Sequence, residues 1–417
     1  MAEWKECTIA DLGTVVGGAT PSTKDPDNYD GGTIPWITPK DLSNFSDRYI
    51  SRGERNITEK GLNGCSTQLM PRHSVLFTSR APIGYVAIAE NEVCTNQGFK
   101  SIVPNDQTDY LFLYYLLKYN KERIEGLGSG TTFKEVSGST MRGIAVRVPE
   151  SLETQKAIGR YLDSIDTKIE INRRINENLE QQAVLLFRSW FTTFSQSENV
   201  ARLPSEFGEI PENFSVVKVG SLKMLVTDYV ANGSFVSLKE NVTLYQEPNY
   251  AYFIRNTDLK SGSFEVFVDQ HSYEFLSKST LYGGEIIISN VGDVGSVFLC
   301  PKLDGPMTLG NNIIMLRPED DTLRYYLYIW FKHLQGQAII QGIKGGSAQP
   351  KFNKTDFKNT SVLLPPAEML ASFHATVSPM FELISQNQAE NKRLSTMRDA
   401  LLPQLMSGEI DVSELEI

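Results

Sequence analysis

The chain has 417 residues, of which 41% are hydrophobic and 22% are charged. This composition is typical of a globular protein and excludes a disordered or collagen-like chain, and the length predicts two or three domains. No apolar run is long enough for a membrane span, and the first residues lack the basic start and apolar stretch of a signal peptide. We therefore expect a cytoplasmic protein with no membrane partner.

The net charge of −10 at first argues against a nucleic-acid partner, because such proteins usually carry a basic surface. Half of the acidic excess, however, lies in residues 367–417, so the rest of the chain is nearly neutral. The four cysteines are far apart, with no CxxC spacing and no histidine cluster beside them. We predict neither a disulfide framework nor a metal site.

The chain repeats itself once, at a period of roughly 210 to 216 residues. An apolar run with a small-residue loop at 75–84 matches residues 286–295, and an aromatic stretch at 110–119 matches residues 324–333. Around these landmarks, short β-branched runs alternate with Gly, Pro, Asn and Asp, which predicts strands and turns. The sequence thus indicates two similar α+β modules, at 1–150 and 201–366.

After each module the pattern changes to that of a long helix, at 151–200 and again at 367–417 with a C-terminal tail. Apolar residues step by four and three without a slip from Ile158 to Trp190 and from Phe373 to Leu405, which is the repeat of a coiled-coil seam. We expect Pro403 to end or kink the second helix near its last step. Two such seams in one chain pair most simply with each other.

Two asparagines straddle the centre of each seam, near residues 174 and 389. An antiparallel pairing, which we predict, places Asn172 opposite Asn391 and Asn176 opposite Asn387. Buried Asn pairs fix the register of a coiled coil, although a parallel pairing would also match Asn to Asn. The alternative is that these asparagines are exposed and each helix packs only on its own module.

The first seam corresponds to roughly 50 Å of helix at 1.5 Å per residue. Antiparallel helices of this length would separate the two modules in a pseudo-two-fold relation. One turn of DNA is about 34 Å. Two nucleic-acid-binding modules held in this way would contact two short sequences with an unread gap between them.

Catalytic motifs are missing from the sequence. There is no phosphate-binding loop with its lysine, no dinucleotide fingerprint and no HExxH, and the four histidines are isolated. The tetrapeptide Leu364-Pro365-Pro366-Ala367 only approximates the signature of adenine methyltransferases. We expect a protein that is not an enzyme, with no catalytic residues.

Two modules, each followed by a long helix, resemble the specificity (S, HsdS) subunit of type I restriction-modification systems. The most specific segments are Leu152 to Ile158 with its continuation to Asn176, and the tail Leu401 to Ile410. The second helix departs from the first, with Gln388-Ala389 where the first has Arg173-Arg174. This difference does not affect the predicted fold, but it means that the two helices need not make equivalent partner contacts.

The resemblance implies that each module is a target recognition domain that reads one half of a split sequence in double-stranded DNA. The helices would set the gap and bind methyltransferase (M) subunits, two in number. The chain itself would bind no cofactor, because S-adenosylmethionine belongs to the M subunit, and ATP and magnesium belong to the restriction (R) subunit. A different class of function, a coiled-coil scaffold that binds proteins or glycans without DNA, remains as the alternative.

The candidate DNA contacts are loop residues for which both modules offer polar side chains suited to base edges or phosphates. Each of them could instead be an ordinary turn residue. In the first module they are Thr38, Lys40, Ser79, Arg80, Asn96, Gln97, Ser129, Thr131 and Lys134. In the second module they are Arg255, Asn256, Ser289, Asn290, Asn311, Asn312, Lys344, Ser347 and Lys351.

The aromatic stretches at 110–119 and 324–333 have two interpretations. Tyrosines and tryptophans could form stacking platforms for single-stranded nucleic acid. Their helical spacing favours the other interpretation, in which they form part of the hydrophobic core.

Overall fold

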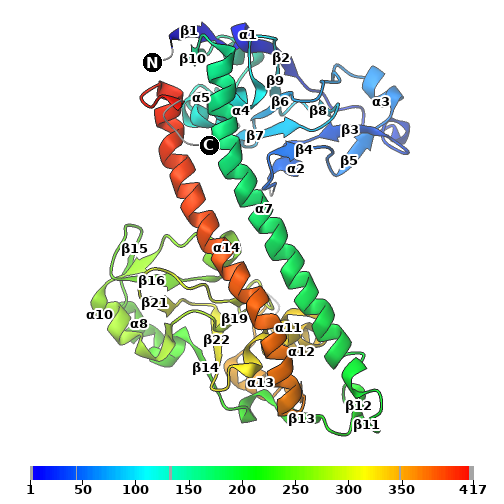
Figure 1. Ribbon diagram of the computed structural model, residues 1–417, viewed down its shortest axis with the longest axis vertical. Coiled ribbons are helices and arrows are strands. Elements are labelled where there is room, and N and C mark those ends of the chain that lie inside the picture. Colours follow the sequence, from blue (N-terminus) through cyan, green and yellow to red (C-terminus); the bar gives the residue numbers. More distant parts are fainter. Residues whose placement is uncertain (1–2, 44, 131–133, 347–348, 413–417) are drawn as a thin grey trace. The chain divides into compact units, whose positions relative to one another are not determined.

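The computed structural model describes residues 3–43, 45–130, 134–346 and 349–412 (Figure 1). The chain forms two compact units: unit 1 comprises Met1–Arg173 and Ala389–Ile417, and unit 2 comprises Arg174–Gln388. Both boundaries lie inside long helices, near the expected centres of the two seams. Each unit therefore contains one module together with about half of each helix, rather than the helices forming segments of their own. No helix of the described ranges is long and apolar enough to cross a membrane.

Unit 1 is built on two sheets and a two-stranded ribbon. The five-stranded sheet has the order β2-β9-β6-β7-β4, and the three-stranded sheet has the order β5-β3-β8. The strands are β1 (Trp4–Thr8), β2 (Gly13–Gly17), β3 (Ile34–Ile37), β4 (Tyr49–Ile50), β5 (Arg55–Ile57), β6 (Val75–Ser79), β7 (Ile83–Ala89), β8 (Cys94–Thr95), β9 (Lys100–Pro104) and β10 (Ala145–Pro149). The shorter helices are α1 (Ile9–Leu12), α2 (Pro39–Leu42), α3 (Glu59–Asn63), α4 (Tyr110–Tyr119), α5 (Lys121–Gly126) and α6 (Gly138–Arg142).

Unit 2 has a four-stranded sheet of order β14-β22-β19-β20 and a five-stranded sheet of order β15-β17-β16-β21-β18. Its strands are β11 (Arg202–Ser205), β12 (Gly208–Pro211), β13 (Ser215–Lys218), β14 (Met224–Asp228), β15 (Leu244–Tyr245), β16 (Ala251–Ile254), β17 (Phe267–Val268), β18 (Thr280–Leu281), β19 (Ile286–Ser289), β20 (Val297–Leu299), β21 (Met307–Leu309), β22 (Ile313–Pro318) and β23 (Ser361–Leu364). Its shorter helices are α8 (Phe235–Asn241), α9 (Asn256–Ser261), α10 (Gln270–Phe275), α11 (Thr322–Lys332), α12 (Leu334–Gly342) and α13 (Lys354–Lys358).

The two units share one topology, which confirms the predicted internal repeat. The sheet order β2-β9-β6-β7 of unit 1 corresponds to β14-β22-β19-β20 of unit 2. The parallel pair β3–β8 corresponds to the parallel pair β16–β21, and the antiparallel ribbon β1–β10 corresponds to β13–β23. The mixed strand and helix content of both units also confirms the α+β fold class.

The aromatic stretches are core helices and do not form stacking platforms. In α4 every residue from Leu111 to Leu117 is buried, and in α11 the run from Tyr325 to Phe331 is buried. Tyr115 and Trp330 are among the largest fully buried side chains of the described residues. Burial of such large rings is a main source of stability for each unit.

The long helices are α7 (Leu152–Phe191) and α14 (Ala367–Ser407). The prediction was that Pro403 ends or kinks the second helix. The helix does not end at the proline, because α14 continues past it for another turn to Ser407. Leu405 and Met406 follow the proline and are buried in the core of unit 1. This packing holds the last turn helical although the proline has no amide hydrogen to donate.

The asparagine pairs confirm the antiparallel arrangement in each unit. In unit 1, Asn172 Nδ2 donates to Asn391 Oδ1 at 2.9 Å, and in unit 2, Asn387 Nδ2 donates to Asn176 Oδ1 at 2.8 Å. Asn172 and Asn387 are buried, so the alternative of exposed asparagines is wrong for them. A slipped register would leave buried amides facing apolar side chains without partners.

Candidate nucleic-acid interface

Four loops of unit 1 that contain predicted DNA contacts lie together. β3 and β8 are parallel, so the residues that follow them, Thr38 and Asn96, leave the sheet at the same edge. The Asn96 amide donates to Ile37 O at 3.0 Å, the Ser79 amide to Gly98 O at 2.7 Å, and the Val136 amide to Ser79 O at 3.0 Å. We call residues 38–40, 79–82, 96–98, 129–130 and 134–136 the unit 1 loop cluster.

The same backbone bonds join four loops of unit 2. The Gly310 amide donates to Ile254 O at 2.8 Å, the Asn290 amide to Asn312 O at 3.1 Å, and the Phe352 amide to Asn290 O at 3.0 Å. We call residues 255–256, 290–295, 310–312, 344–346 and 349–352 the unit 2 loop cluster. The structure thus brings each set of predicted loops together within its own unit.

These bonds also define which residues of the two clusters are equivalent. Ser79 corresponds to Asn290, so Arg80 corresponds to Val291, in agreement with the match of residues 75–84 to residues 286–295. The loops also share a left-handed glycine, Gly84 with φ of 96° and Gly295 with φ of 101°. A cation in unit 1 therefore has an apolar side chain as its equivalent in unit 2.

Two of the predicted residues cap short helices. Thr38 is the N-cap of α2, and its hydroxyl donates to Asp41 Oδ2 at 2.6 Å. Arg255 is the N-cap of α9, and its guanidinium forms an ion pair of 2.6 Å with the buried Asp258. Both side chains are therefore engaged in stabilising the turn that follows β3 or β16.

Ser79, Asn96 and Asn290 form internal hydrogen bonds, whereas the Ser289 hydroxyl has no partner among the described residues. The side chains of Ser79 and Ser289 are fully buried, and the Ser79 hydroxyl donates to Gly98 O at 3.2 Å. Asn96 Oδ1 accepts from the Gly98 amide at 2.8 Å, which is the turn role left open by the sequence. Asn290 Nδ2 donates to Phe352 O at 3.3 Å, while its Oδ1 is buried without a partner among the described residues.

The remaining predicted polar residues lie at the surface. Lys40 forms an exposed ion pair of 2.7 Å with Glu54, and Lys344 donates to Gln341 Oε1 at 3.0 Å. The other exposed residues of this group are Gln97, Ser129, Lys134, Asn311, Asn312 and Lys351. Thr131 and Ser347 lie outside the described residues.

One carboxylate of the unit 1 loop cluster faces two cations. Arg80 Nη1 lies 3.4 Å from Glu135 Oε2, and Lys100 Nζ lies 3.3 Å from Glu135 Oε1. Lys100, the first residue of β9, also lies 3.5 Å from Ser79 Oγ. Sequence comparison missed Lys100 because its equivalent in unit 2 is the apolar Ile314.

A carboxylate of the unit 2 loop cluster is likewise surrounded by donors. Asp293 Oδ2 lies 2.5 Å from Lys260 Nζ, 2.5 Å from Ser296 Oγ and 3.5 Å from Asn256 Nδ2. The hydrogen bonds from Lys260 and Ser296 lower the pKa of Asp293 below its usual value, against a smaller opposing effect of burial. Asp293 is therefore ionised at neutral pH.

A further segment of unit 1, at 19–24, was not predicted to contribute to the loop cluster. The Thr20 hydroxyl donates to Gln97 Oε1, and Trp36 Nε1 donates to Ala19 O at 3.1 Å. This segment has no counterpart of similar sequence in unit 2, so a search for matching positions could not find it. Its run of small and polar residues was the available signal.

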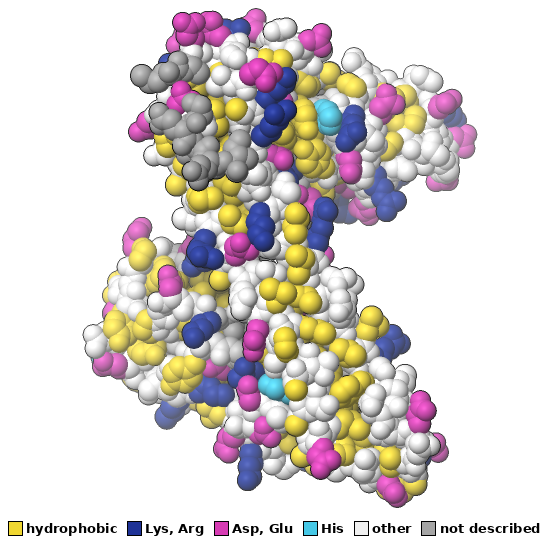
Figure 2. Space-filling view, in the orientation of Figure 1, with side chains coloured by type: hydrophobic (Ala, Val, Ile, Leu, Met, Phe, Trp, Pro, Cys, Tyr) yellow, Lys and Arg dark blue, Asp and Glu magenta, His cyan; other side chains and the backbone are white. Residues whose placement is uncertain are grey.

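Among the described residues, no group of three or more His, Cys, Asp and Glu side chains could hold a metal ion. On the face shown in Figure 2, Lys and Arg side chains are interspersed with Asp and Glu side chains. The loops thus present mixed charges together with exposed amides and hydroxyls. Such a surface suits contacts to base edges and phosphates more than a broad electrostatic attraction to DNA.

Comparison with known proteins identifies the family. The family described as "Type I restriction modification DNA specificity domain" matches residues 1–181 and 212–395. The chain belongs to this family.

The relatives of these specificity domains span nearly the whole chain. The type I restriction enzyme MjaIX specificity subunit of Methanocaldococcus jannaschii is 36% identical, over 99% of this chain and 95% of the relative. The HindI specificity subunit of Haemophilus influenzae is 23% identical, over 98% of this chain and 100% of the relative. The crystal structure of a type I restriction-modification S subunit from M. genitalium shares the fold, with a TM-score of 0.60, 18% identity and coverage of 97% and 96% of the two chains.

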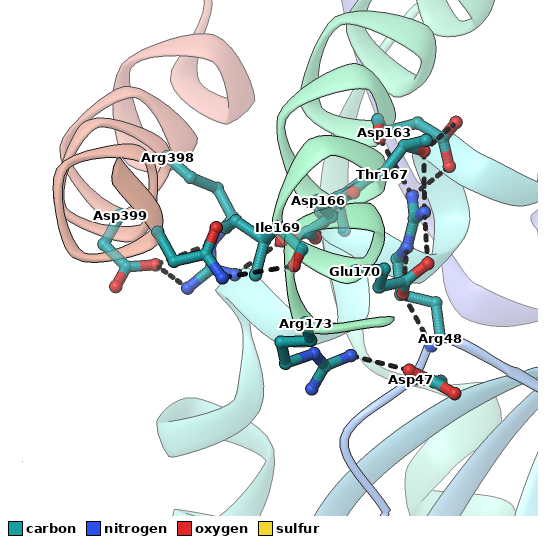
Figure 3. Close-up of polar contacts among 12 residues, drawn as sticks. Asp47, Arg48, Asp163, Asp166, Thr167, Ile169, Glu170, Arg173, Arg398 and Asp399 are labelled. Atoms are coloured by element: carbon teal, nitrogen blue, oxygen red, sulfur yellow. Dashed lines mark hydrogen bonds and ion pairs between the residues drawn. The ribbon is translucent and has the colours of Figure 1, made fainter. Parts of the chain in front are cut away.

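The first specificity domain is fastened to α7 by a buried arginine in the loop before β4 (Figure 3). Arg48 Nε and Nη2 donate to the two oxygens of Glu170 at 2.9 and 3.0 Å, and Nη2 also donates to Thr167 Oγ1 at 2.8 Å. Nη1 pairs with Asp163. Beside it, Arg173 Nη2 forms an ion pair of 2.6 Å with Asp47 (Figure 3).

A second polar contact joins α4, α7 and α14 within unit 1. Asp166 accepts from Tyr115 Oη at 2.8 Å and from Arg398 Nη1 at 2.6 Å. Burial raises the pKa of Asp166, but the positive charges of Lys118 and Arg398 outweigh it and hold the pKa below its usual value. The α4 helix is thereby tied to both long helices.

The second specificity domain has a corresponding contact between α11 and α7. Glu180 accepts from Lys332 Nζ at 2.5 Å and from Tyr328 Oη at 2.6 Å. Burial raises the pKa of Glu180, but Lys332 and Tyr328 together lower it below its usual value. In each unit, a carboxylate on α7 therefore bonds to the buried helix that packs against the sheet. Asp166 bonds to α4 in unit 1, and Glu180 bonds to α11 in unit 2.

Proposed function

We propose that this chain is the non-catalytic subunit that selects the DNA sequence for a type I restriction-modification complex. Each specificity domain reads one half of a split, asymmetric target in double-stranded DNA. Residues of the two loop clusters make the base and phosphate contacts. The exposed members are Lys40, Gln97, Ser129, Lys134, Asn311, Asn312, Lys344 and Lys351, and Arg80 is partly exposed.

The observation that carries this proposal is the difference in side chains on a shared backbone. Three positions beside equivalent backbone hydrogen bonds carry Arg80, Lys100 and Glu135 in unit 1, and Val291, the buried Ile314 and Lys351 in unit 2. Arginine and lysine suit the O6 and N7 acceptors of guanine, whereas an apolar side chain suits the methyl group of thymine. One scaffold with such different side chains would read two different half-sites.

We assign the partner contacts to the long helices. α7 and α14 each run from one unit into the other, so a helix length sets the number of unread base pairs in this proposal. The helices bind two methyltransferase (M) subunits, which supply S-adenosylmethionine and methylate adenine. Restriction (R) subunits, with ATP and magnesium, join that complex in the cytoplasm.

The isolated chain is expected to bind DNA weakly. Its net charge is −10, and Arg80 and Lys260 are already paired with carboxylates. Affinity for DNA depends largely on the number of phosphates that basic side chains neutralise. M subunits would therefore supply many of the contacts to DNA phosphates.

The test is co-expression with the neighbouring M subunit in a host that lacks DNA methylation, followed by mapping of methylated adenines across the genome. A single split motif with one gap length is expected. Exchange of residues 1–150 for those of another specificity subunit should change one half of the motif only. This exchange keeps both long helices intact, so the gap length serves as the internal control.

A well-formed complex that methylates no DNA would contradict the proposal. Selective retention of proteins or glycans by such a complex, with no retention of target DNA, would instead favour the scaffold function.

A further inference from the structure

Each loop cluster contains one carboxylate that pairs with side-chain donors of the kind that bind DNA bases and phosphates. In unit 1, Glu135 lies between Arg80 and Lys100, and in unit 2, Asp293 accepts from Lys260 and Asn256. A carboxylate presents the same kind of acceptor oxygens as a DNA phosphate. The protein thus satisfies these donors internally.

These contacts are placed where a ligand can replace them. The side chains of Arg80 and Glu135 are 34% and 37% exposed, and those of Lys260 and Asp293 are 48% and 47% exposed. Ion pairs at such exposure contribute little net stability, because water competes for both partners. Separation of either pair therefore requires little free energy.

The shared fold does not require these carboxylates. Lys351 occupies the position of Glu135 in unit 2, where the Lys351 amide and Gly345 O repeat the bond between the Glu135 amide and Ser129 O. Pro82 occupies the position of Asp293 in unit 1. The two units thus place a carboxylate beside their donors in different loops. If the shared fold required such a contact, the carboxylate would occupy equivalent positions in both units.

We propose that Glu135 and Asp293 are internal competitors that DNA must displace, and that they sharpen the selection of each half-site. The proposal rests on the DNA-recognition function proposed above. At a correct half-site, base acceptors engage the released donors with good geometry and replace the lost contacts. At a wrong site the released donors can make only loose contacts to phosphates. The displaced carboxylate then lies near phosphates, which carry the same sign of charge.

The experiment measures equilibrium DNA binding by the complex of this chain with its M subunit. The variants are Glu135→Gln and Asp293→Asn, which keep the shape of each side chain and remove its charge. Four duplexes are compared: the target, the target with the first half altered, the target with the second half altered, and an unrelated sequence. The first half is defined as the one read by residues 1–150.

The matched controls remove one negative charge elsewhere in the same unit. Asp27→Asn affects an exposed carboxylate paired with Lys60 at 2.8 Å, and Glu274→Gln affects an exposed carboxylate that accepts from Gln270 at 2.8 Å. Both residues lie outside the loop clusters. They report the general effect of a less negative protein on DNA binding.

Glu135→Gln should reduce discrimination against the altered first half by about 3- to 5-fold and leave discrimination at the second half unchanged. Asp293→Asn should give the opposite pattern, and the controls should change affinity for all duplexes equally. Equal changes for variant and control, or unaltered discrimination, would overturn the proposal. A wild-type complex that fails to prefer the target would overturn the recognition function as well, so the two failures are distinguishable.

Discussion

Asn172 and Asn391 meet in the paired helices of unit 1, with Asn172 Nδ2 donating to Asn391 Oδ1 at 2.9 Å. Asn172 is almost completely buried, and Asn391 Nδ2 donates in turn to Ile169 O at 3.2 Å. The pair therefore helps to fix the register of α7 against α14, together with the hydrogen bond from Asn172 Nδ2 to Glu390 Oε2 at 2.7 Å.

Replacement of one member of this pair should destabilise unit 1. Asn172→Leu leaves Asn391 Oδ1 without its donor, and the expected loss is about 1–3 kcal/mol of unfolding free energy. The double variant Asn172→Leu/Asn391→Leu should lose less than the single variant, because it leaves no unpaired amide. Urea unfolding measures both, and a double variant less stable than the single one would refute the pairing.

The contacts of Arg48 predict a much larger loss of stability on replacement than those of Arg173. Arg48→Met would leave the carboxylates of Asp163 and Glu170 without their cation, and breaking a buried pair in this way costs about 3–5 kcal/mol. Thermal unfolding of unit 1 should therefore shift strongly.

Arg173→Ala is the matched control for Arg48. The Arg173–Asp47 pair joins the same loop to the same helix, but its side chains are 29% and 42% exposed. Its removal should cost less than about 1 kcal/mol. Equal losses of unfolding free energy from Arg48→Met and Arg173→Ala would show that burial does not determine how strongly each ion pair stabilises unit 1.

Asp166 predicts a dependence of stability on pH. Its pKa in the folded protein is lower than in the unfolded chain, so the ionised carboxylate stabilises the fold. This stabilisation is complete above the ordinary aspartate pKa and is lost as pH falls through the lower folded value.

The variant Asp166→Asn tests that dependence. It should be less stable at neutral pH, because Arg398 and Tyr115 lose a charged acceptor, and the difference from the wild type should shrink below about pH 4. Unfolding free energies at several pH values provide the measurement. A difference that stays constant down to strongly acidic pH would contradict the assignment.

Arg80 is expected to contribute to DNA recognition in one half-site. Arg80→Ala should weaken binding of the target by the complex with M subunits. If Arg80 contacts a phosphate, the slope of log affinity against log salt concentration should fall by about 1. If it contacts a base edge, discrimination at one base pair should fall by about 1–3 kcal/mol instead.

The equivalent position in unit 2 supplies the control. Val291→Ala removes only apolar atoms, so it should not alter the salt dependence. Methylation assays on duplexes with single altered base pairs distinguish the two modes for Arg80. Unchanged binding in both assays would exclude Arg80 from the interface.

The sequence by itself determined the repeat, the α+β modules, the two long helices and the asparagine register. These features depend on the spacing of apolar and polar residues within one segment, and that spacing is visible without knowing which segments meet. The core role of the aromatic stretch around Tyr115 followed in the same way, because its spacing is that of a buried helix.

Tertiary structure decided the features that depend on residues far apart in the chain. The antiparallel direction required the contacts of Asn172 with Asn391 and of Asn176 with Asn387, because matched asparagines allow either direction. The continuation of α14 past Pro403 required the packing of Leu405 and Met406 on unit 1. The roles of Arg48, Lys100 and Glu135 depended on which charges folding brings within reach of one another. Local periodicity contains no information about such contacts, so only the folded chain could reveal them.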